Sequence, residues 1–111
     1  MRIEIHSNDN SIRERLFSSA KTSYGTKSEQ SQGIVIESRM LEGKQFLDSP
    51  EIIEFVINNA SVVGTGVLAA WLYDIIKLGI SKLRINGEET KLDAKAVEEA
   101  IIRALKKSHD S

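Results

Sequence analysis

The chain has 111 residues, a formal net charge of −1 at pH 7 and no cysteine. This length suits one domain with a single modest core. The near-neutral charge argues against bulk attraction to nucleic acid or anionic lipid. The missing cysteine excludes disulfides, zinc–thiolate sites and cysteine nucleophiles. We expect a cytoplasmic protein without a signal peptide, with one compact domain at 1–108 and a frayed tail at 109–111.

The first elements follow from two short patterns. Residues 2–6 alternate polar and apolar, with Ile3 and Ile5 on one face, which predicts a half-buried strand. Ser11, followed three residues later by Glu14, forms a capping-box pattern that predicts a helix. The apolar side of that helix would carry Ile12, Leu16, Phe17 and Ala20.

The middle of the chain predicts a loop, a strand and two helical stretches. Residues 22–32 are polar and aperiodic, as in a surface loop, and the β-branched run 33–38 predicts a central strand. The sequence Asp-Ser-Pro-Glu at 48–51 is typical of a helix start. Weak helix formers between Asn58 and Gly66 predict a kink, after which a second helix reaches about Leu78. The first of these helices would contain Ile52, Ile53, Phe55, Val56 and Ile57.

Asn86-Gly87 lies between two alternating runs, which is the strongest short hairpin signal because both turn positions need positive φ. Asp93 then caps a last helix with apolar residues at helical spacing. The expected order is β-α-β-α-α-β-β-α. This order predicts an α/β (α+β) two-layer sandwich, with a mixed sheet of about four strands and the helices packed on one face.

Phe55 to Tyr73 contains no charged residue, and its length approaches that of a membrane span. Asparagines lie inside the run, and Asp74 and Lys77 follow it within a turn, without the flanking basic cluster that orients a span. We therefore expect a buried helix of a soluble protein and no stable membrane span. Insertion induced by a partner is the alternative.

Two motifs are considered as chemical sites and set aside. Glu4 and His6 share a strand face and could begin a metal site, but no second ligand pair accompanies them. Gly64-Thr65-Gly66 lacks the preceding strand and following lysine of a phosphate-binding loop, which favours a helix kink. No nucleophile stands at recognisable spacing from a base. We expect no enzyme activity, catalytic residue, cofactor or bound metal.

The best candidate for an interaction site is the aromatic and charged cluster at the end of the uncharged run. Trp71 is the only tryptophan, and such residues anchor interfaces and pockets. On the hairpin, basic residues face Glu88 and Glu89, which favours a cross-strand charge ladder over a nucleic-acid site. The candidate interaction residues are Trp71, Tyr73, Asp74, Lys77, Lys82 and Arg84.

The strand-opening MRIEI, the segment Ala70-Trp71-Leu72 and the helix start Leu92-Asp93-Ala94 occur in this order. With the elements between them, they resemble the effector-associated constant component families of bacterial conflict systems over most of the chain. The resemblance implies a non-catalytic adaptor that docks onto a larger effector encoded nearby, and it supplies no catalytic residue. A homodimer is also expected. The alternatives are a small ligand-binding regulatory domain with a pocket near Trp71, and a phage or toxin-system inhibitor.

Overall fold

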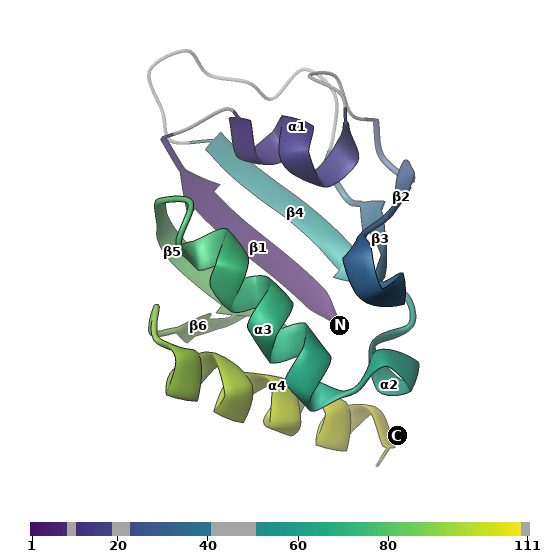
Figure 1. Ribbon diagram of the computed structural model, residues 1–111, viewed down its shortest axis with the longest axis vertical. Helices are drawn as coiled ribbons and strands as arrows, with labels where there is room; N and C mark the ends of the chain where they lie inside the picture. The colour runs from purple at the N-terminus through teal and green to yellow at the C-terminus, as the bar shows by residue number, and fades with distance from the viewer. Residues whose placement is uncertain (9–10, 19–22, 41–50, 110–111) are drawn as a thin grey trace.

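Alternating apolar residues place β1 (Arg2–Ser7) inside an antiparallel sheet in the computed structural model, which describes residues 1–8, 11–18, 23–40 and 51–109 (Figure 1). Ile3 and Ile5 are fully buried, as the alternation predicts. On either side, β1 pairs with β4 (Glu51–Ile57) and β5 (Ile80–Ile85). Among the described residues the sheet has six strands, in the order β2-β3-β4-β1-β5-β6.

The remaining elements frame these three strands. The outer strands are β2 (Lys27–Glu29), β3 (Val35–Ser38) and β6 (Glu88–Thr90). The helices are α1 (Ser11–Phe17), α2 (Ala60–Val63), α3 (Thr65–Ile76) and α4 (Ala94–His109), with a 3-10 turn, η1, at Ser31–Gly33. The α+β class is confirmed. The predicted mixed sheet of about four strands is wrong, because every pairing is antiparallel and two further strands join it.

The predicted helix over residues 51–57 is also wrong, because this segment forms β4. Its residues alternate, with Ile53 and Phe55 fully buried while Ile52 is 52% exposed. This two-residue period matches a strand with one covered face. Pairing with β1, from Arg2 opposite Val56 to Ser7 opposite Glu51, outweighs the helix-start signal. The signal's first three residues, 48–50, lie outside the described part of the chain, as does Ala20.

The predicted loop at 22–32 contains β2 and the beginning of η1. A strand of three residues is too short to show a period, so the sequence pattern does not reveal it. The predicted strand at 33–38 is present as β3, although it lies next to the outer strand β2 and not at the centre of the sheet.

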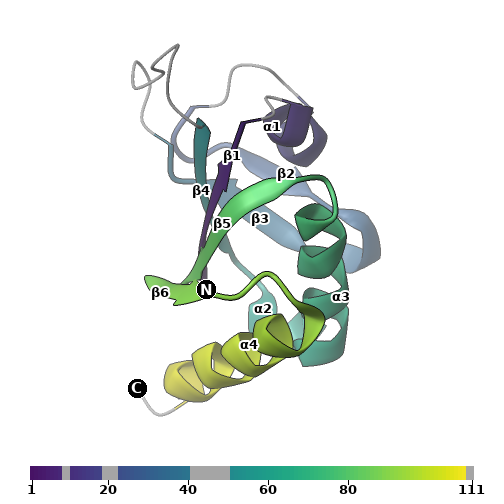
Figure 2. The same ribbon diagram turned by 90° about the vertical axis from the view of Figure 1, so that its left-hand side faces the viewer.

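Helices α1 and α3 lie on one face of the sheet, and α4 runs beside α3 near one end of the strands (Figure 2). The core lies between this helical layer and the sheet. Its fully buried side chains come from both layers and include Ile3, Ile5, Ile12, Ile53, Phe55, Leu68, Leu72, Leu83, Val97 and Ile101. The predicted arrangement of two layers therefore holds for α1 and α3, whereas α4 lies near one end of the strands (Figure 2).

The uncharged run from Phe55 to Tyr73 does not form a single helix. Its first residues end β4, a short α2 follows, and Gly64 at φ +92° separates α2 from α3. The predicted break before Gly66 is thus confirmed. In the part of the chain that the structure describes, no helix combines the length and apolar character needed to cross a membrane.

Both predictions for the C-terminal third are confirmed. β5 and β6 form an antiparallel hairpin around Asn86 and Gly87, whose φ angles are +54° and +82°. The Asp93 side chain accepts a hydrogen bond from the Ala96 amide at 2.8 Å, which caps α4. α4 continues as far as His109, and residues 110–111 lie outside the described part.

Candidate binding site

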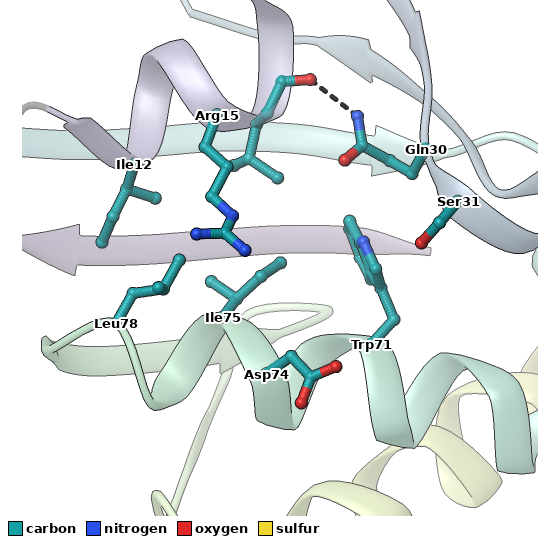
Figure 3. A pocket seen from close by; sticks show the side chains of 9 residues that line it. Ile12, Arg15, Gln30, Ser31, Trp71, Asp74, Ile75 and Leu78 are labelled. Carbon is teal, nitrogen blue, oxygen red and sulfur yellow. Dashed lines mark hydrogen bonds between the residues drawn. The ribbon is translucent and has the colours of Figure 1, made fainter.

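A pocket of about 190 Å³ opens between α1 and α3, and we call it the α1–α3 pocket (Figure 3). Each helix contributes one stripe of side chains, because residues three or four apart share a helix face. Gln30, between β2 and η1, and Ser31, the first residue of η1, close the third side. The lining residues are Ile12, Arg15, Leu16, Gln30, Ser31, Trp71, Asp74, Ile75 and Leu78.

Trp71 forms one wall of this pocket and packs against the hydrophobic core. Its ring meets Phe55 edge to face, with centroids 6.0 Å apart and planes at 77°. Phe55 meets Phe17 in the same way at 6.4 Å. Edge-to-face pairs of this kind have a defined geometry and add to the free energy of burial. The indole is therefore half-buried and oriented, with one side left for the pocket.

Gln30 joins β2 to the end of α1. Its side-chain amide donates a hydrogen bond to the Leu16 carbonyl at 2.6 Å and another to the Ser28 hydroxyl at 3.0 Å. The Ser28 hydroxyl donates to the same Leu16 carbonyl at 2.7 Å. The last carbonyls of a helix lack partners within the helix, so these side chains satisfy one of them. The arrangement fixes the Gln30 amide and turns its oxygen toward the pocket (Figure 3).

Charges of opposite sign stand on the two rims. Arg15, on α1, is exposed, and among the described residues it has neither an ion-pair nor a hydrogen-bond partner. Asp74, on α3, forms an ion pair with Lys77 at 3.8 Å. The unpaired charge of the pocket is therefore the Arg15 guanidinium, which extends across the space between the helices (Figure 3).

The six predicted interaction residues separate into two groups in the structure. Trp71, Tyr73 and Asp74 belong to α3 and Lys77 is its C-cap, but only Trp71 and Asp74 line the pocket. Lys77 instead lies over the Tyr73 ring, 4.8 Å from its centroid. This second contact ties Tyr73 to the Asp74–Lys77 ion pair.

Lys82 and Arg84 alternate on β5 with the buried Leu83, so they lie on the sheet face opposite the helices. Lys82 pairs with Glu89 at 3.5 Å, and Arg84 pairs with Glu4 at 3.7 Å. The Lys82–Glu89 pair is part of the predicted charge ladder across the hairpin, whereas Arg84 pairs with β1 and Glu88 pairs with Arg103 of α4. Lys82 and Arg84 thus stand apart from the α1–α3 pocket and do not extend it.

Glu4 also contacts His6, with 2.8 Å between Oε2 and Nε2. Among the described residues, no group of three or more potential ligands of the His, Cys, Asp and Glu types stands close enough to hold a metal ion. This carboxylate–imidazole contact lies on the charged face of β1.

Sequence reasoning missed the α1 side of the pocket. Ile12 and Leu16 were recognised as an apolar stripe, but Arg15 and Gln30 carried no signal of their own. They line one pocket with Trp71 only because the fold brings together segments more than forty residues apart in the sequence. No family model, no curated protein and no solved structure matches the chain. The function is therefore inferred from the geometry of the chain itself.

Proposed function

We propose that this chain is a non-catalytic interaction protein that docks onto a larger protein through the α1–α3 pocket. One observation carries the proposal: an oriented, half-buried Trp71 stands beside an apolar floor and an unpaired Arg15. Interfaces concentrate their binding energy in a few residues, and tryptophan and arginine are enriched among them. A partner side chain that fills the pocket would remove apolar surface of both molecules from water.

The pocket volume favours a protein partner over a cofactor. Ligand and cofactor sites usually enclose roughly 300–1,000 Å³, whereas this pocket offers about 190 Å³. That space suits one or two side chains of a partner. A ligand-binding regulatory domain is the second candidate function, because Trp71 lines a pocket. A pocket of this size requires a correspondingly small ligand.

The chemistry of the lining residues supports a non-catalytic role. The polar groups of the described lining are Arg15, Gln30, Ser31 and Asp74. Ser31 has no histidine beside it there that could act as its base. These groups can hold a partner by charge and hydrogen bonds, and the absence of enzyme activity stays a prediction.

The resemblance to effector-associated components suggests the kind of partner. Ala70-Trp71-Leu72, the central segment of that resemblance, lies in α3 and supplies the pocket's aromatic wall. We propose that the partner is a larger effector of a bacterial defence system, encoded beside this chain. If the neighbouring gene instead encodes a toxin or a phage protein, the same pocket would serve an inhibitor.

Coexpression of the tagged chain with the products of the flanking genes tests the proposal. Arg15→Glu reverses the unpaired rim charge and should reduce copurification of the partner at least tenfold. Lys95→Glu is the matched control, because Lys95 is also exposed and without an ion pair among the described residues, but it lies on α4. Thermal melts of both variants establish that they fold.

Retention of the partner by the Arg15→Glu variant would place the interface elsewhere on the molecule. If no flanking product copurifies at all, the adaptor role is wrong. The expected homodimer is tested separately, by sedimentation velocity over a range of concentrations. A sedimentation coefficient that does not change over this range and corresponds to one chain would contradict it.

A further inference from the structure

We infer that the α1–α3 pocket recognises the C-terminal residue of a partner chain, an apolar residue bound through its side chain and its free carboxylate. This inference rests on the proposed docking function and specifies its ligand. Three features of the pocket carry it: an unpaired cation, a fixed hydrogen-bond acceptor and an apolar floor, all around a space that fits one residue.

The unpaired Arg15 guanidinium favours a ligand with an anionic group. Asp74 on the opposite rim is already paired with Lys77, whereas Arg15 has no partner among the described residues. A guanidinium presents a planar fork of donors that matches the two oxygens of a carboxylate. A ligand carboxylate is therefore directed to the α1 rim, at Arg15.

The Gln30 side-chain oxygen, a hydrogen-bond acceptor of fixed orientation, favours a ligand with an N–H group. Both described hydrogen bonds of the Gln30 side chain use its nitrogen, toward Leu16 and Ser28. Its amide orientation is therefore set, and the oxygen facing the pocket is available to accept a hydrogen bond (Figure 3). The main-chain N–H of a bound residue is the donor that this oxygen can receive.

The apolar floor of the pocket favours a ligand with an aliphatic or aromatic side chain. Ile12, Leu16, Ile75 and Leu78 supply it, with Trp71 as the wall. The space of about 190 Å³ holds roughly six water molecules at ~30 Å³ each, which is close to one leucine-sized residue.

A chain terminus combines all three ligand groups in that small space. In a C-terminal residue, the N–H, the apolar side chain and the carboxylate branch from a single Cα. An internal residue has no carboxylate at that position, and its main chain would have to continue past Arg15. If the carboxylate came instead from an Asp or Glu side chain, the partner would have to place that acidic residue in the pocket together with the apolar one. The pocket offers little room for two residues.

The test uses the whole chain labelled with ¹⁵N and three small probes. N-acetyl-leucine carries the complete set of groups, and N-acetyl-leucine amide lacks only the charge. An N-acetylated, C-amidated leucyl-aspartyl dipeptide places its one carboxylate on a side chain. The indole N–H of Trp71 reports binding without ambiguity, because it is the only tryptophan. The side-chain N–H signals of Arg15 and Gln30 report on the two polar contacts.

N-acetyl-leucine should shift these signals with a dissociation constant of about 1–10 mM, as expected of a ligand of this size. The amide and the dipeptide should each bind at least fivefold more weakly. Arg15→Gln should make the acid and its amide bind equally. Arg103→Gln, which removes an exposed arginine of α4 that faces Glu88, should leave the preference intact.

Equal binding of the acid and its amide to the native chain would overturn the inference, as would a dipeptide that binds as tightly as the acid. So would the absence of any shift at about 50 mM, several times the expected constant. The probes need no partner, so these results are separate from the copurification experiment. A partner lost on Arg15→Glu with no carboxylate preference here would leave the docking function standing and remove only the terminal-residue inference.

Discussion

Asn86 forms two hydrogen bonds with the main chain of Arg2. Its side-chain oxygen accepts from the Arg2 N–H at 2.9 Å, and its own N–H donates to the Arg2 carbonyl at 2.8 Å. The first turn residue thus continues the pairing of β5 with β1 beyond Ile85, the last residue of β5. The hairpin turn therefore holds the beginning of the central strand as well as joining β5 to β6.

Substitution by alanine should change the stability in opposite directions at two glycines, Gly87 in the hairpin turn and Gly66 in α3. Gly87 has φ +82°, so Gly87→Ala should lower the free energy of unfolding by about 1–2 kcal/mol. Gly66 lies in α3 without positive φ and with open space around it, so Gly66→Ala should raise the free energy of unfolding by up to about 1 kcal/mol. Urea denaturation of both variants measures the pair. A Gly87→Ala protein as stable as the native one would contradict the turn geometry.

Asn59 performs a similar role at the start of β3. Its side chain accepts from the Val35 N–H at 3.0 Å and donates to the Gly33 carbonyl at 2.7 Å. Asn59→Ala should cost about 2 kcal/mol, since a typical hydrogen bond contributes about 1 kcal/mol. The neighbouring Asn58 is exposed and makes one long side-chain contact, 3.5 Å to Glu37, so Asn58→Ala should change stability by less than about 0.5 kcal/mol. Equal losses in the two variants would refute this role.

Asp93 is predicted to stabilise α4 as its N-cap. Asp93→Ala removes the acceptor of the Ala96 N–H and should cost about 1 kcal/mol. Asp93→Asn keeps an acceptor in the same place and should cost less. Thermal melts followed by circular dichroism compare the three proteins. An asparagine variant that loses as much as the alanine variant would indicate that the charge near the helix end, and not the hydrogen bond, stabilises α4.

Glu37 predicts an acid-dependent contribution to stability. The Arg39 guanidinium, hydrogen-bonded to this carboxylate, holds the pKa of Glu37 below its usual value. A lowered folded-state pKa stabilises the fold above the ordinary glutamate pKa, and this stabilisation is lost as the pH falls through the lowered value. Arg39→Gln should raise the Glu37 pKa, measured by NMR titration of the ¹³C-labelled carboxyl. An unchanged titration would show that Arg39 does not set this pKa.

The same pair can be checked through unfolding. The native protein should gain free energy of unfolding from the ionised Glu37 at neutral pH, relative to the Glu37→Gln variant. This gain should disappear in acid, where Glu37 is protonated. Arg39 also lies over the Tyr24 ring at 5.1 Å, and that contact does not depend on the protonation of Glu37. A difference that persists unchanged in acid would therefore point to the aromatic contact or to packing.

Local patterns identified those elements whose interactions lie mainly within a few residues. The helix start at Ser11, the Asn86-Gly87 turn and the Asp93 cap each depend on side chains or φ angles that act on nearby backbone groups, so the sequence predicts them directly. The alternation of Ile3 and Ile5 likewise identified a strand with one covered face, which burial confirms.

The segment 51–57 shows where local signals fail. Pro50 and Glu51 favour a helix start, while the alternating burial of Ile53 and Phe55 suits a strand. The choice depends on β1, which offers this segment a pairing partner from Arg2 to Ser7. That partner lies about fifty residues earlier in the chain, so no window of local sequence contains the deciding interaction.

The sequence alone therefore determined the α+β fold class, the half-buried first strand, the hairpin and the last helix, because turns, caps and periodicity act over short distances. It also marked Trp71 as the residue on which a site would be built. Only the tertiary structure decided that β4 is a strand and that Trp71, Arg15 and Gln30 line one pocket. The strand depends on pairing with β1 and the pocket on the packing of α1 and α3 against one sheet. Interactions between distant segments leave no spacing in the sequence by which to recognise them.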